Sequence, residues 1–133
     1  MPNETRIEIH SDADIVAARQ VGRALATQIG FSGSDLTVIA TAISEVARNI
    51  VRYANQGELI LSIIRKGTRQ GMQVVARDEG PGIADVELAM QDGYSTGNSL
   101  GLGLPGARRL MDEFEIDSAP GRGTTVILRK WKI

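Results

Sequence analysis

Glu45 and Asn49 are the two residues of this chain whose types and spacing most directly suggest chemistry. They stand four positions apart, which places them one turn apart on the same side of an α-helix. A carboxylate there can act as a general base, and an amide oxygen can bind Mg²⁺, a cation that prefers oxygen ligands. A glutamate and an asparagine on the solvent side of an amphipathic helix have the same spacing. For the pair alone, that simpler interpretation is favoured by roughly four to one.

An acidic turn follows this pair along the chain. Asp78 ends an apolar stretch and is followed by Gly80 and Gly82. A carboxylate at the end of a strand can accept a hydrogen bond from an exocyclic amine such as that of adenine, and glycines let the backbone approach a ligand without a Cβ atom in the way. A simple Asp-Glu-Gly-Pro-Gly turn has the same sequence, and for this segment alone we slightly favour the turn.

The segment 101–106, Gly-Leu-Gly-Leu-Pro-Gly, matches a pattern found at dinucleotide sites. A Rossmann fold needs a strand directly before it, and a polar stretch stands there instead. What remains is a phosphate site formed by backbone N–H groups at the start of a helix. No lysine or arginine lies between Arg77 and Arg108, so Mg²⁺ and backbone donors must carry much of the phosphate charge. Whether Arg48, Arg52 or Arg108 also helps is open.

The last of the four features is the segment 121–124, Gly-Arg-Gly-Thr. A hairpin turn accounts for its glycines. Thr124 could also reach a nucleobase from the adjoining strand, and the residues alone leave that role open. Each feature is weak by itself, but together in one small chain they indicate a nucleotide site.

The elements that must position these residues follow from hydrophobic spacing. Strands are predicted for residues 5–10, 58–64, 72–77, 113–119 and 124–131, and helices for 11–29, 35–54, 84–90 and 100–112. The segment 66–71 is expected to be a hairpin loop, and the polar segment 91–99 a mobile loop or lid. This order predicts an α+β fold, a two-layer α/β sandwich with helices on one face of a mixed, mostly antiparallel sheet.

Within the predicted helix 35–54, apolar residues recur at three- and four-residue steps and form one buried stripe. At roughly 100° per residue, Glu45 and Asn49 fall on the flank of that stripe, whereas Arg48 and Arg52 lie near the opposite pole. A helix on a sheet would aim such a flank at the edge of a cleft.

Length and composition limit the possible functions. The chain has 133 residues, which favours a single domain spanning residues 1–133. Its net charge of −1 gives no basic surface for nucleic acid and no reason to expect a membrane surface. The absence of cysteine excludes disulfides and thiol catalysis, and it fits a cytoplasmic location. His10 stands alone, so a histidine phospho-acceptor domain is not expected.

The order of the four features resembles the GHKL ATPases, the superfamily of gyrase, Hsp90, histidine kinases and MutL. The chain is similar over nearly its whole length to the RsbT-type serine/threonine switch kinases of the stressosome. The segments that carry this closer resemblance are 14–20 (DIVAARQ), 41–49 (from TAISE to Asn49) and 101–114 (GLGLPGARRLMDEF).

The resemblance implies a Bergerat-type ATP-binding fold and a role for each matching residue. Glu45 would be the general base, Asn49 the Mg²⁺ ligand, and Asp78 the partner of the adenine amine. The other implied contacts to ATP would come from Gly80, Gly82, Gly101, Gly103, Leu104 and Thr124, under a lid over roughly 86–100. Such kinases phosphorylate Ser or Thr on STAS-domain scaffold or antagonist proteins and, once released, activate a PP2C-type phosphatase.

Three alternatives stay open at this point. The first is an anti-sigma factor kinase, which has the same fold but mainly sequesters a sigma factor. The second is a non-catalytic module that uses nucleotide only as a conformational ligand, an alternative that the presence of Glu45 disfavours. The third is an ATP hydrolase that passes the phosphate to water.

Overall fold

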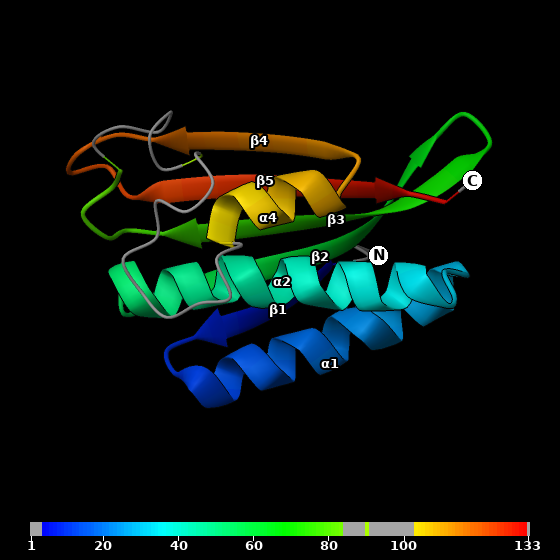
Figure 1. Cartoon of the computed structure of the whole chain (residues 1–133), viewed down its shortest axis with the longest axis horizontal. Helices are drawn as coiled ribbons and strands as arrows, with labels where there is room; N and C mark the ends of the chain where they lie inside the picture. Colours follow the sequence, from blue (N-terminus) through cyan, green and yellow to red (C-terminus); the bar gives the residue numbers. More distant parts are fainter. Residues whose placement is uncertain (1–3, 84–89, 91–102, 133) are drawn as a thin grey trace.

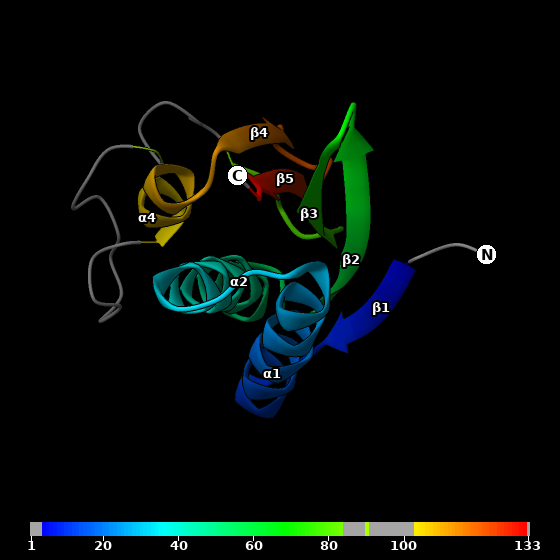
Figure 2. The ribbon, with the colours of Figure 1, turned by 90° about the vertical axis from the view of Figure 1, so that its right-hand side faces the viewer.

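The protein forms two layers, a five-stranded sheet and a layer of helices that covers one of its faces. The computed structural model describes residues 4–83, 90 and 103–132. Figure 1 looks onto the helices with the sheet behind them, and Figure 2 shows the two layers edge-on. The other face of the sheet carries no helix among the described residues.

The sheet has the strand order β1-β2-β3-β5-β4, and every neighbouring pair is antiparallel. Its strands are β1 (Glu4–Ile9), β2 (Gly57–Lys66), β3 (Arg69–Asp78), β4 (Glu113–Ser118) and β5 (Thr124–Trp131). Three helices complete the described fold: α1 (Asp12–Ile29), α2 (Ser34–Tyr53) and α4 (Gly103–Leu110). The predicted fold class is therefore confirmed.

Local sequence explains where the first helix begins and ends. The Asp14 carboxylate accepts hydrogen bonds from the backbone N–H groups of His10 and Ser11 and so caps the start of α1. Gly30 ends this helix in the left-handed conformation, with φ of 111°. After the short connection that follows, α2 lies beside α1 on the sheet.

The core lies between the sheet and the helices, and α2 is its central element. Residues along one side of α2 are almost fully buried, as are the residues of the central strands that face the helices. The largest fully buried side chains include Ile39, Ile43, Val46 and Ile50 of α2 and Leu59, Leu61, Met72, Val74, Val126 and Leu128 of the sheet. The buried stripe predicted for α2 is thus observed.

The β2–β3 connection is shorter than the sequence predicts. The prediction of a loop over 66–71 is wrong. β2 continues to Lys66 and β3 begins at Arg69, which leaves a two-residue turn. Gly67 makes this turn possible with φ of 63°, a conformation that suits a tight hairpin. The continuous ladder also keeps both strands' backbone groups paired, which favours the longer strands over an open loop.

Two predicted elements lie largely outside the described residues, namely the helix 84–90 and the loop or lid 91–99. Met90 is described, and it is buried against the core. The last predicted helix, 100–112, is described as α4 from Gly103 to Leu110. None of the described helices has the length and apolar character needed to cross a membrane.

Candidate nucleotide site

The structure brings most of the predicted site residues to one end of the sheet. Asp78 ends β3 and is paired in register with Thr124, which begins β5. The second half of α2 carries Glu45 and Asn49, and α4 packs beside α2 from Gly103 onwards. Residues that are up to 79 positions apart in the sequence, from Glu45 to Thr124, therefore surround one region.

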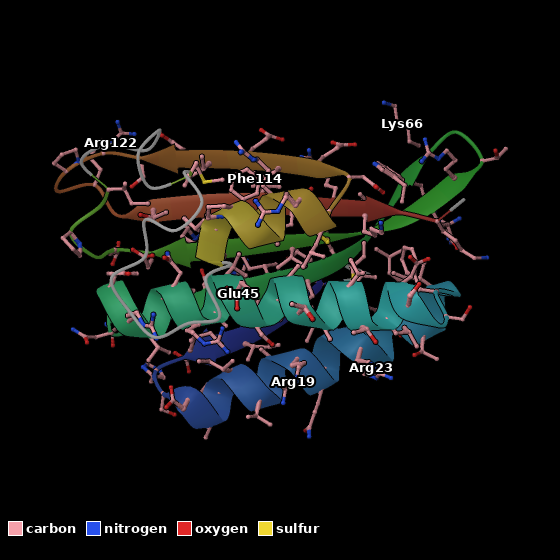
Figure 3. The ribbon with its side chains drawn as sticks, in the orientation of Figure 1. Arg19, Arg23, Glu45, Lys66, Phe114 and Arg122 are labelled. Atoms are coloured by element: carbon pink, nitrogen blue, oxygen red, sulfur yellow. The ribbon has the colours of Figure 1, made fainter. Side chains whose placement is uncertain are left out.

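Glu45 is more deeply buried than a residue on a helix flank would be. Its residue exposure is 7%, because α4 packs against that side of α2. Figure 3 shows Glu45 on α2 beside α4. Its carboxylate accepts a hydrogen bond from the Arg48 guanidinium, three residues further along the helix. Arg48 therefore folds back toward the site. The helical geometry alone had indicated that it extends away from the site.

Asn49 has a side chain that is free to bind a ligand. The residue is half-buried, and no described residue makes a hydrogen bond to its amide group. No group of three or more His, Cys, Asp or Glu side chains that could hold a metal occurs in the described part of the chain. An amide oxygen suits Mg²⁺, which prefers oxygen ligands, commonly keeps several waters and takes few protein ligands.

Asp78 is a buried carboxylate with one oxygen already engaged. The residue is 8% exposed, and its Oδ1 accepts a hydrogen bond of 2.9 Å from the backbone N–H of Gly80. This bond orients the side chain at the end of β3. Since Oδ2 has no partner among the described residues, it can accept a further hydrogen bond.

Ser118 joins this end of the sheet, and sequence reasoning did not identify it. Its hydroxyl lies 2.8 Å from that of Thr124 and 3.0 Å from the Gly123 carbonyl oxygen, and it accepts a 2.8 Å hydrogen bond from the Ile83 N–H. The three contacts fix Thr124 to the loop after β3. Ser118 is also the register partner of Thr124, so the predicted β4–β5 hairpin was the signal that could have revealed it.

Glycine is required at positions 80 and 82 by packing within the protein, whereas the sequence suggested close approach of a ligand. A Cβ atom on Gly80 would lie 2.6 Å from the Cβ of Ala54, and one on Gly82 would lie 1.9 Å from the carbonyl oxygen of Ala119. Both glycines let the loop after β3 pack against the protein itself, at the end of α2 and at the β4–β5 turn. Close approach of a ligand to their backbone stays a prediction.

The start of α4 is more open. A Cβ atom on Gly103 would meet only Pro105 within 4 Å, at 3.8 Å, so its backbone is accessible. Leu104 is 5% exposed and packs into the hydrophobic core, which leaves its backbone as the part that could meet a phosphate. Gly101 lies outside the described residues. Arg108 is exposed on α4.

A hollow of about 430 Å³ lies at the same end of the molecule, between the ends of β1, β2 and β3. Asp78 contributes to it, but so do Glu8, Glu58 and Glu79. The pKa of Glu58 is lowered, mainly because the Arg77 guanidinium donates hydrogen bonds to its carboxylate, so this residue carries a negative charge at neutral pH. With Asp78, four acidic side chains line the hollow, against Arg77 and His10, so its lining is mainly acidic.

Comparison with known proteins gives matches over nearly the whole chain. The family model described as histidine kinase-like ATPase domain matches residues 10–130. A serine/threonine-protein kinase RsbT of Bacillus subtilis is 45% identical over 131 residues, which cover 98% of each chain. An anti-sigma F factor of Caldanaerobacter subterraneus subsp. tengcongensis is 34% identical, covering 86% of this chain and 82% of its own. The corresponding protein of Halalkalibacterium halodurans is 36% identical, with 85% and 81% covered.

Proposed function

Because the chain belongs to the histidine kinase-like ATPase domain family, we propose that it is a protein serine/threonine kinase that transfers phosphate from ATP to a STAS-domain protein. The resemblance predicted from the sequence is confirmed at the level of this family and of its RsbT-type members. The RsbT relative, named as a serine/threonine-protein kinase, covers the whole domain at 45% identity and supports the reaction type. The observation that carries the proposal is the buried, paired Glu45 one turn from the unoccupied amide of Asn49.

In the proposed reaction the hydroxyl oxygen of the acceptor Ser or Thr attacks the γ-phosphorus of ATP. The bond from that phosphorus to the β–γ bridging oxygen breaks, ADP leaves, and Glu45 accepts the proton of the hydroxyl. A buried carboxylate held by one neighbour is suited to this task because its orientation is fixed before the acceptor arrives. Glu45 can also serve by orienting the hydroxyl, and both roles require the same carboxylate.

The remaining site residues bind ATP. Asp78 accepts a hydrogen bond from the adenine amine through its free oxygen, and Thr124, fixed by Ser118, supports the same side of the base. Backbone N–H groups at Gly101 and Gly103 meet the phosphates. Asn49 is the residue that would hold Mg²⁺, and the ion would neutralise charge on the ATP phosphates.

The proposed partners follow from the relatives and the earlier resemblance. STAS-domain scaffold or antagonist proteins of a stressosome are the acceptors, and a PP2C-type phosphatase is the target that the released kinase activates. We place this cycle in the cytoplasm. The match to both a kinase named RsbT and anti-sigma F factors supports a setting in sigma factor regulation.

A second candidate is an anti-sigma factor kinase, which the two anti-sigma F factor relatives favour. Such a protein would bind a sigma factor directly and would phosphorylate a STAS-type antagonist. Co-purification of the chain with candidate sigma factors and STAS proteins distinguishes the two functions. Stable capture of a sigma factor would select the second.

The proposal is tested by incubating the chain with labelled ATP, Mg²⁺ and a panel of STAS-domain proteins. We expect label on Ser or Thr of at least one STAS protein, identified by mass spectrometry, and no transfer when Mg²⁺ is chelated. Label that appears only as free phosphate would indicate an ATP hydrolase. Binding of ATP without any release of phosphate would indicate a non-catalytic module.

A further inference from the structure

The two oxygens of the Glu45 carboxylate differ in their contacts. Nη1 of Arg48 donates to Oε1, and no other described residue makes a hydrogen bond to this carboxylate. Every fully buried polar side-chain atom among the described residues has a hydrogen-bond partner. Oε2 has no such partner among the described residues. One oxygen is held by the protein and the other is available to a substrate.

Burial makes a positive partner necessary for Glu45. Its side chain is 8% exposed, and a carboxylate removed from water to this extent is costly as an ion unless it is paired and hydrogen-bonded. Arg48 is the one cation of the described residues that contacts it. The Arg48 side chain is itself 35% exposed, so it lies between the buried carboxylate and the solvent.

From this geometry we propose that Arg48 is a positioning residue for phosphoryl transfer. It fixes the Glu45 carboxylate by holding Oε1, so that Oε2 faces the acceptor hydroxyl. The inference rests on the proposed role of Glu45 and adds a second residue to it. Arg48 itself takes no proton and makes no contact with ATP in this arrangement.

A phosphate ligand is the competing role for an arginine at this place. The two roles differ in what the enzyme loses when the charge is removed. A residue that acts through Glu45 affects the chemical step, so kcat falls while KM for ATP is unchanged. A residue that binds phosphate in the ground state raises KM for ATP instead.

Three variants test the proposal by steady-state transfer to a STAS acceptor. Arg48→Met keeps the apolar stem without the charge, Arg48→Lys keeps the charge, and Lys66→Met removes a cation at the far end of β2, as Figure 3 shows. We expect Arg48→Met to lower kcat about tenfold or more with KM for ATP unchanged. Arg48→Lys should recover most of the rate, and Lys66→Met should match the unaltered chain. An unchanged kcat in Arg48→Met, a rise in KM alone, or a lysine variant as slow as the methionine variant would overturn the proposal.

A double-mutant cycle shows whether Arg48 works through Glu45. If it does, Arg48→Met combined with Glu45→Gln should be no slower than Glu45→Gln alone, because there is no charged carboxylate left to position. Losses that multiply would overturn the inference. The cycle also separates two failures: a fast Glu45→Gln variant contradicts the base itself, whereas a slow Glu45→Gln beside a fast Arg48→Met contradicts the role of Arg48 alone. Circular dichroism and ATP binding confirm that each variant is folded.

Discussion

Two glutamate–arginine pairs, one in the helix layer and one on the open face of the sheet, differ in their surroundings. Glu45 and Arg48 belong to α2, in the layer of helices, with side chains 8% and 35% exposed. Glu58 and Arg77 pair across β2 and β3 on the open face, with 29% and 49% exposed and a contact of 2.8 Å. The two pairs consist of the same chemical groups. They differ in exposure because helices cover only one face of the sheet.

This difference decides what each pair can do. On the open face water solvates both charges, so the pair contributes little free energy and leaves no reactive group in a dry site. Beneath α4 the carboxylate depends on a single arginine and has one unpartnered oxygen. A buried carboxylate that is oriented and has one oxygen without a partner is suited to chemistry, whereas a solvated pair is suited to holding two strands together.

The largest expected effect is on the buried pair, and it comes from Glu45→Gln. Gln keeps the size and hydrogen-bonding ability of the side chain but cannot accept the hydroxyl proton. Phosphate transfer should therefore fall by a factor of roughly 10² or more while ATP binding is retained. Transfer rates under saturating ATP, together with ATP binding by calorimetry, measure both quantities. Transfer at the unaltered rate would contradict a catalytic role for the buried pair.

An intermediate effect is expected at the second buried carboxylate, Asp78. Its proposed partner is the adenine amine, which guanine replaces with a carbonyl oxygen that cannot donate. A hydrogen bond to a charged group contributes about 1.5–3 kcal/mol, so Asp78→Asn should weaken ATP binding about tenfold to a hundredfold and reduce the preference for ATP over GTP. Asp117→Asn, at an exposed position of β4, is the matched control. An unaltered preference would mean that another group recognises the base.

Much of this comparison could be predicted from the sequence, because regular spacing sets which face of an element is buried. The apolar stripe of α2 and the alternation in β5 predicted their elements correctly. The Asp78–Thr124 neighbourhood depends on the pairing of β3 with β5, which hydrophobic spacing does not indicate. The position of Arg48 could not be predicted, since a helix fixes where a side chain begins but a long flexible side chain can fold toward either neighbour. Ser118 was missed for a different reason: its three contacts depend on a loop meeting a strand from elsewhere in the chain.

The smallest expected effect is on the open-face pair, in the variant Glu58→Gln. The pKa of Glu58 lies below its ordinary value of 4.5, first because Arg77 donates a side-chain hydrogen bond and then because of the Arg77 and Arg6 charges. Because the pKa of Glu58 is lower in the folded chain, its charge stabilises the fold at pH values above the ordinary pKa. This stabilisation is lost as the pH falls through the lowered pKa.

Urea unfolding at pH 7 should show Glu58→Gln to be less stable by about 0.2–1 kcal/mol, since the pair is partly solvated. The difference should shrink at 1 M salt, which screens surface charges within about 3 Å. It should vanish in acid below the lowered pKa, where Glu58 is protonated in the unaltered chain as well. Phosphate transfer should not change at any of these pH values when compared with the unaltered chain. A stability difference that persists in acid, or a loss of transfer comparable to that of Glu45→Gln, would show that the open face contributes more than an ion pair between two strands.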